Sequence, residues 1–133
     1  MATDLRITVG AYETDIKWLV PTLKGSYWGA HYTNEAILTA IYRSLCFNAW
    51  IGSEQVGFAR VMTDAALTSV LNDVIVDGLW RGRGFGTALL KAVFAHHQVA
   101  PTICILQARP QNFGLYSKFG FVPVGSMLKR DPQ

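Results

Sequence analysis

The sequence predicts one mixed α/β domain over residues 1–133, in which helices flank a mostly antiparallel sheet. A chain of this length can bury a sizeable core but is too short for two ordinary domains. Half of its residues are hydrophobic and 16% are charged, a balance typical of folded globular proteins. Strand-like segments come first as a hairpin and then in one strand–helix crossover, which favours a mixed sheet with helices on its faces.

The first half of the chain alternates strand and helix patterns. Residues 5–11 show the period-two alternation of a strand, and Thr14 is the candidate N-cap of a short helix that ends near Pro21. Residues 34–45 place their apolar side chains on one helical face. The elements expected here are a strand at 5–11, helices at 14–20 and 34–45, and strands at 47–51 and 56–63 that form a hairpin.

The second half begins with the strand that is expected to be central. After it, apolar residues from Phe85 to Val93 recur at the spacing of one helical face, so the following helix is expected to pack on the sheet. The elements expected in this half are strands at 69–76, 102–107 and 121–128 and helices at 87–97 and 111–119. A glycine-rich loop joins the central strand to its helix.

This loop carries the strongest functional signal of the chain, because glycines and arginines alternate in it: Arg81-Gly82-Arg83-Gly84-Phe85-Gly86-Thr87. Glycine leaves backbone N–H groups unobstructed, and a helix N-terminus carries about half a positive charge. Arginine adds forked donors that match phosphate oxygens. The loop therefore predicts a phosphorylated ligand, although a tight strand–helix turn would also favour glycine.

The spacing excludes two common phosphate-binding loops. A dinucleotide-binding fingerprint needs a glycine at the position that Thr87 occupies, and a Walker loop needs Gly-Lys followed by Ser or Thr, which the chain lacks. The spacing that fits is Arg-x-x-Gly-x-Gly, at Arg81, Gly84 and Gly86. This pattern resembles the pyrophosphate loop of the GNAT superfamily of N-acetyltransferases, which bind acetyl-CoA.

A second segment strengthens this resemblance. Residues 115–121, Leu-Tyr-Ser-Lys-Phe-Gly-Phe, are similar to the Leu-Tyr-x-Lys-x-Gly-Phe segment near the C-terminus of many GNAT enzymes. One predicted helix and one predicted strand separate it from the loop, which is the order in the family. Two motifs in the right order are more specific than either alone, and the resemblance covers most of the chain.

The resemblance implies the GNAT fold, in which the fourth and fifth strands diverge and the pantetheine arm of acetyl-CoA lies in the gap. The backbone of residues 74–76 is then expected to bond the pantetheine amides, and N–H groups of residues 82–87 to receive the pyrophosphate. Asn112 lies one helical turn before Tyr116 and is expected to point the same way, although a common form of the motif has Asn where this chain has Arg109. The predicted cofactor-binding residues are Val74, Ile75, Val76, Arg81, Gly82, Arg83, Gly84, Phe85, Gly86, Thr87 and Asn112.

The chemistry implied is direct transfer of an acetyl group from acetyl-CoA to a primary amine within a ternary complex. Tyr116 matches the tyrosine that serves in the family as donor to the departing thiolate. A phenol of pKa ~10 is a weaker acid than a thiol of pKa ~8.5, so complete proton transfer is uphill by roughly 2 kcal/mol. Tyr116 is therefore expected to act first as a hydrogen-bond donor. The structural alternative is a core aromatic beside Leu115 and Phe119.

Asp73 is the candidate general base, because it is a carboxylate within a mostly apolar strand, where burial would raise its pKa. The alternative is that it caps a bulge or pairs with an arginine such as Arg60 on the neighbouring strand.

The ring-rich loop at residues 25–32 is the candidate wall of the acceptor site. Its predicted substrate-binding residues are Tyr27, Trp28, His31 and Tyr32. Aromatic rings beside flexible glycines can close over a small amine, or they can simply cover one face of the sheet. The acceptor itself stays open among small amines, amino acids, peptide N-termini and lysine side chains.

Composition constrains the remaining classes. A net charge of +3 without a basic run permits an anionic cofactor but does not indicate nucleic acid, and no run of 18 apolar residues indicates a membrane span. No cluster of Cys and His has metal-ligand spacing, so no metal is expected. Cys46 and Cys104 lie singly in apolar runs, which favours inert, reduced thiols. A cytoplasmic protein is expected, since the first residues do not resemble a signal peptide, and a homodimer would fit a relative of this family.

Two other functions stay open from the sequence. One is a non-catalytic module on the same fold that binds an acyl-CoA or another partner. The other is a nucleotide-binding regulatory domain, which would be stabilised by ATP or NAD rather than by CoA.

Overall fold

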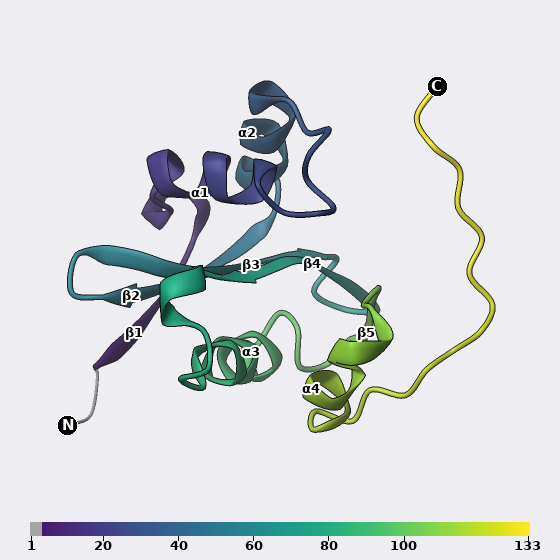
Figure 1. The fold of residues 1–133 in the computed structure, drawn as a ribbon. Helices are drawn as coiled ribbons and strands as arrows, with labels where there is room; N and C mark the ends of the chain where they lie inside the picture. The colour runs from purple at the N-terminus through teal and green to yellow at the C-terminus, as the bar shows by residue number, and fades with distance from the viewer. Residues whose placement is uncertain (1–3) are drawn as a thin grey trace.

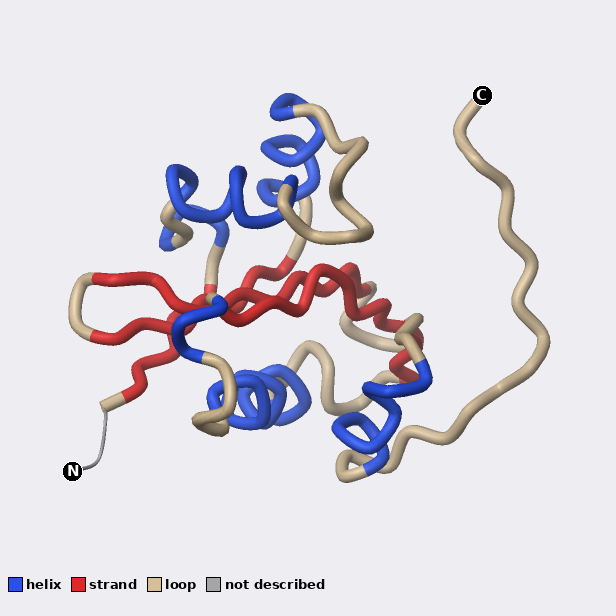
Figure 2. Tube along the Cα trace, viewed as in Figure 1, coloured by secondary structure: helices blue, strands red, loops and turns tan. Residues whose placement is uncertain are grey.

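The computed structural model describes residues 4–133 and contains one five-stranded sheet with helices on both faces (Figures 1 and 2). The strands are β1 (Leu5–Val9), β2 (Leu45–Ile51), β3 (Glu54–Thr63), β4 (Thr68–Val76) and β5 (Ile103–Leu106), and they lie side by side in chain order. The first four are antiparallel to their neighbours, and β5 is parallel to β4. The mixed, mostly antiparallel sheet predicted from the sequence is therefore confirmed.

Helices divide between the two faces of the sheet. They are α1 (Ile16–Lys24), α2 (Asn34–Tyr42), α3 (Phe85–Ala95) and α4 (Phe113–Ser117), with short 3₁₀ turns at Ala11–Glu13, Gly78–Trp80 and Pro110–Asn112. Figure 1 shows α1 and α2 above the sheet and α3 and α4 below it. In the described part of the chain, no helix is long and apolar enough to cross a membrane.

Each helical layer has its own apolar core against the sheet. On one face, Leu89 and Val93 of α3 are fully buried among side chains that include Phe47 of β2. On the other face, Leu19 and Leu23 of α1 pack with buried residues of α2 and of the sheet. Successive side chains of a strand point to opposite faces, so the strands contribute to both cores. The sheet is therefore covered on both faces where the helices lie.

The first helix differs from its prediction at both ends. Its N-cap is Asp15, whose carboxylate accepts from the backbone N–H of Lys17 and Trp18, whereas the hydroxyl of Thr14 donates to buried Asn48 at 2.8 Å. The helix then continues through Pro21 to Lys24. A proline inside a helix costs about 3 kcal/mol, and burial of the residues after it, Leu23 above all, offsets this cost.

Other boundaries move by a few residues. The helix predicted at 34–45 ends at Tyr42, because Leu45 already begins β2. The helix predicted at 87–97 is α3, which begins at Phe85 because Gly84, with a left-handed φ of 81°, serves as its N-cap. The short helix predicted at 111–119 is a 3₁₀ turn followed by α4.

The strand predicted at 121–128 is absent, so this prediction was wrong. The last backbone hydrogen bond runs from Phe121 N–H to the Tyr116 carbonyl, at 3.4 Å, and every residue from 122 to 133 is exposed. Figure 1 shows this segment extended and apart from the body. A strand needs a neighbour for its N–H and C=O groups, and here the segment lies beside none.

Truncation of the main core should strongly destabilise the fold. Leu89 is fully buried in α3, so Leu89→Ala should lower the free energy of unfolding by about 2–5 kcal/mol through lost burial and the cavity left behind. Urea unfolding followed by circular dichroism measures this. Leu79→Ala is the matched control, because Leu79 is 83% exposed and should change stability by about 0.5 kcal/mol or less. Equal losses in the two variants would contradict the assignment of the core.

Candidate functional site

The site is created by the divergence of β4 and β5. Their pairing covers only four positions and ends at Leu71 and Leu106, whereas β4 continues to Val76 along β3. Residues 72–76 of β4 therefore have no partner strand on the β5 side. Unpaired backbone N–H and C=O groups need another partner, so this edge is suited to a ligand with amide groups of its own.

A β-bulge sits where the divergence begins. The register of β3 against β4 shifts between Phe58 and Arg60, and Asp73 on β4 adopts a left-handed φ of 53°. This conformation costs a non-glycine residue on the order of 1–3 kcal/mol, and Asp is one of the few residues enriched in it. At this bulge the Asp73 side chain contacts one residue of β3 and one residue of the ring-rich loop.

Both carboxylate oxygens of Asp73 are engaged. One accepts from Nε of Arg60 at 2.7 Å, and the other accepts from the indole Nε1 of Trp28 at 2.8 Å. The Asp73 side chain is only 5% exposed, so this is a largely buried ion pair. The interaction ties the ring-rich loop to the sheet. Of the alternatives left open by the sequence, the bulge and the Arg60 partner are both present.

The glycine-rich loop has the conformation that an anion cradle requires. Gly82 and Gly84 have left-handed φ values of 77° and 81°, and Gly84 caps α3 without any side-chain hydrogen bond. The first N–H groups of α3 are therefore free of a capping side chain and open to an anion. Arg81 donates from Nε to the Val76 carbonyl at 3.0 Å, which joins the loop to the end of β4.

A groove of about 870 Å³ runs from this loop along the open edge of β4. Of the eleven residues predicted to bind the cofactor, ten line this groove and Arg83 does not. The guanidinium of Arg83 instead lies over the Trp80 ring, with its Cζ 4.8 Å from the ring centroid. Arg83 is thus placed to stiffen the loop rather than to line the groove.

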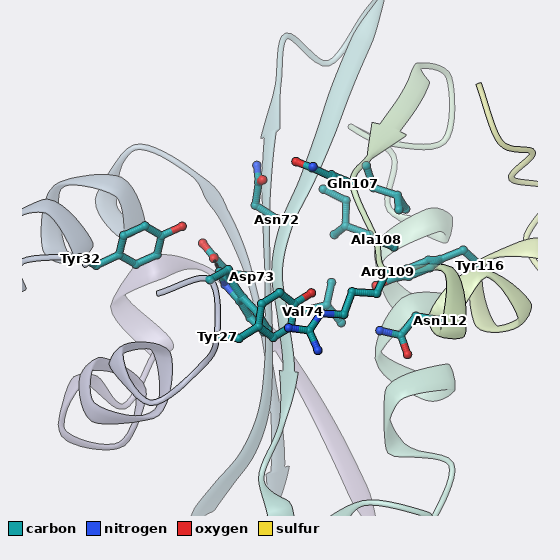
Figure 3. A pocket seen from close by; sticks show the side chains of 13 residues that line it. Tyr27, Tyr32, Asn72, Asp73, Val74, Gln107, Ala108, Arg109, Asn112 and Tyr116 are labelled. Carbon is teal, nitrogen blue, oxygen red and sulfur yellow. Dashed lines mark hydrogen bonds between the residues drawn. The ribbon is translucent and has the colours of Figure 1, made fainter. Parts of the chain in front are cut away.

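A second cavity, of about 390 Å³, lies between the ring-rich loop and the segment that follows β5 (Figure 3). Three of the four predicted substrate-binding rings line it, namely Tyr27, Trp28 and Tyr32, whereas His31 does not. Asp73 lines it as well. The residues common to this cavity and the groove are Tyr27, Trp28, Val74, Asn112 and Tyr116.

Tyr116 stands where the two hollows meet. It lies on α4, packs its ring edge toward Phe121 with 6.0 Å between centroids, and is half-buried. Burial raises the pKa of its phenol above the usual value, and nearby Tyr27 raises it further. Tyr116 therefore keeps its proton at neutral pH and can donate it in a hydrogen bond. Burial and then the Asp73 charge also raise the pKa of Tyr32.

The thiols are not poised as nucleophiles. Burial raises the pKa of Cys46 to about 11, and burial also raises the pKa of Cys104. Both cysteines are free, and neither is a thiolate at neutral pH.

Sequence reasoning missed one wall of the second cavity. Residues 107–109 line it just after β5, as does Asn72 of β4. The sequence shows Arg109 only as a departure from the family motif. In the structure its Cζ lies over the Tyr27 ring, 3.3 Å from the centroid. The residue types at these positions do not by themselves indicate a site. The usable signal was their place at the carboxyl end of a strand, where ligands of open sheets often bind.

Comparisons with known proteins agree with this geometry. Residues 42–123 match a family model described as an acetyltransferase (GNAT) domain. A crystal structure from Xanthomonas campestris, described as belonging to the GNAT family, is 31% identical, with a TM-score of 0.89 over 97% of this chain and 94% of that one. No protein of curated function matches the sequence.

More distant structures share the fold. A probable acetyltransferase of unknown function from Staphylococcus aureus is 18% identical, with a TM-score of 0.78 over 96% of this chain and all of that one. The glucosamine-6-phosphate N-acetyltransferase of Arabidopsis thaliana is 15% identical, with a TM-score of 0.70 over 96% and 98% of the two chains.

Removal of the Asp73 carboxylate should be costly. Asp73→Ala would leave Arg60, which is 13% exposed, without its counter-ion, and should lower the free energy of unfolding by about 3–5 kcal/mol. Asp131→Ala is the matched control, because its ion pair with Lys129 is largely exposed and should contribute at most about 1 kcal/mol. Urea unfolding monitored by tryptophan fluorescence compares the two. A small loss for Asp73→Ala would show that the pair does not hold the bulge.

Proposed function

This chain belongs to the GNAT family of acetyltransferases, and we propose that it is an N-acetyltransferase that moves an acetyl group from acetyl-CoA to a primary amine. The observation that carries this proposal is the meeting of the two hollows at Tyr116. One hollow suits the cofactor and the other suits an acceptor. Both substrates can therefore be held at once, which favours direct transfer in a ternary complex.

The cofactor groove fits acetyl-CoA in its two distinctive parts. The cradle of Gly82 and Gly84, with the uncapped start of α3, suits the pyrophosphate. The unpaired edge of β4 at residues 74–76 suits the pantetheine amides. When bound, acetyl-CoA supplies an activated thioester carbonyl.

Tyr116 is the proposed catalytic residue. Its raised pKa keeps the phenol neutral, and its position between the hollows suits a hydrogen bond to the sulfur of the leaving group. The same rise makes complete proton transfer to a thiolate still less favourable, since a thiol is the stronger acid. We therefore assign Tyr116 the role of stabilising developing negative charge rather than that of a full proton donor.

The acceptor amine must lose its own proton before it attacks. A lysine-like amine of pKa ~10.4 is neutral about once in 2,500 molecules at pH 7, a cost of roughly 4.6 kcal/mol. Asp73 is the general base predicted from the sequence. Both of its carboxylate oxygens already accept hydrogen bonds, one from the Arg60 guanidinium and one from the Trp28 indole. We propose that Asp73 acts mainly as a positioning residue, through Trp28, and that water carries the proton away.

We further propose a cytoplasmic location. The observation that supports it is the pair of free cysteines, Cys46 and Cys104, which a reducing compartment would keep as thiols.

Tyr116→Phe should separate catalysis from cofactor binding. The variant should lower kcat by about 100-fold or more and leave the Kd for CoA unchanged, because it keeps the ring and removes only the hydroxyl. Thiol release from acetyl-CoA across a panel of amines measures kcat, and calorimetry measures the Kd. Tyr12→Phe is the control, since Tyr12 is 93% exposed and lines neither the groove nor the cavity.

The pH profile gives a second readout of the same role. The wild-type rate should rise with pH as the amine deprotonates. Because burial raises the pKa of Tyr116 above the usual value of a phenol, loss of the Tyr116 proton should not lower the rate at any pH below about 10. If no amine releases CoA while acetyl-CoA still binds, the chain is a non-catalytic acyl-CoA-binding module. Full activity of Tyr116→Phe would remove Tyr116 from the mechanism.

A further inference from the structure

The acceptor cavity contains one charge that the protein leaves without a counter-ion. Two formally charged residues line it, Asp73 and Arg109. Asp73 is neutralised by its ion pair with Arg60. Within residues 4–133, the guanidinium of Arg109 forms neither an ion pair nor a hydrogen bond. The cavity is therefore cationic by one charge.

The guanidinium of Arg109 is held in place by stacking. It extends from the segment after β5 to Tyr27 on the opposite wall, with its Cζ over the ring at 3.3 Å from the centroid (Figure 3). Stacking on an aromatic face uses the plane of the guanidinium and leaves the N–H donors at its edges available. Arg109 is thus positioned to receive an acceptor group with two oxygens.

Asn72 also lines this cavity, but its Nδ2 is closed off from the open space and has no hydrogen-bond partner among residues 4–133. Arg109 is therefore the one charged donor that the cavity offers to a ligand. The group that suits its forked N–H donors is one that only accepts hydrogen bonds.

We propose that the amine acceptor is a small molecule that also carries a carboxylate, which Arg109 binds. This rests on the proposed acetyltransferase function and narrows its acceptor class. The cavity of about 390 Å³ has the size of a site for a small molecule. Tyr116 lines the same cavity, so the amine and the carboxylate of one amino acid-like molecule can reach their partners together.

The test compares matched acceptors in the thiol-release assay. Each amino acid is paired with its neutral amide, with the diamine of equal length and with the corresponding amino phosphate ester. The wild type should use the amino acid with a kcat/KM about 10- to 100-fold above that of the amide, as expected for a charge-assisted hydrogen bond. The amide has the less basic amine, so this bias in reactivity works against the expected result.

Arg109→Gln should abolish the preference. Its kcat/KM for the amino acid should fall at least about tenfold more than its kcat/KM for the amide, and its Kd for acetyl-CoA should not change, because Arg109 does not line the cofactor groove. A preference for the diamine, or an equal loss on acid and amide in Arg109→Gln, would overturn the proposal. Preference for the phosphate ester alone would overturn the assignment of a carboxylate.

A binding experiment keeps this proposal separate from the proposed function. Thermal shift with the amino acid added to the CoA-bound protein needs no turnover. Stabilisation of the wild type but not of Arg109→Gln supports the carboxylate site even if no acetyl transfer is seen. Equal shifts in both proteins, or none in either, would contradict it.

Discussion

The arrangement of this molecule depends on how β4 is paired. Along β3 it is paired from Ser69 to Val76 with one bulge at Asp73 and Val74, but along β5 it is paired at only four positions. The long pairing with β3 keeps β4 in the sheet, and the short pairing with β5 leaves its second half with free backbone groups on that side. A strand that is held on one side and open on the other can bind a ligand by its backbone without losing its place in the sheet. Both hollows of the site open from this one divergence.

The bulge at Asp73 connects this divergence to the opposite wall. A left-handed backbone at Asp73 is unfavourable by itself, and it persists because Arg60 and Trp28 both bind its largely buried side chain. The same contacts therefore set the geometry of β4 and fix an indole in the wall of both hollows. Stability and site geometry are coupled through a single carboxylate.

Charge is distributed unevenly between the two hollows. In the groove, the glycine loop and the start of α3 attract negative charge. In the cavity of about 390 Å³, Arg109 is the charge without a counter-ion among residues 4–133, because Asp73 is paired with Arg60. Tyr116 lines both hollows, and burial raises the pKa of its phenol, so it stays neutral between them.

Local patterns were enough to predict most of the elements of this fold. Strand alternation and helical spacing act over a few residues, and the loop of alternating glycines predicted the anion cradle because conformation and donor availability there are properties of the glycines themselves. The spacing of Arg81, Gly84 and Gly86, with the segment around Tyr116, was likewise enough to indicate the family.

Tertiary structure decided what depends on partners far apart in the chain. The first helix runs through Pro21 because burial of Leu23 outweighs a local penalty. Asp73 is engaged by Arg60 and Trp28 rather than free, and Arg109 reaches Tyr27 across the cavity, because the bulge and the end of β5 bring these residues together. For residues 121–128, strand propensity was not sufficient, since a strand forms only where another strand's edge meets it. Sequence patterns report what a segment can form, whereas the sheet and its open edge determine which of those possibilities finds a partner.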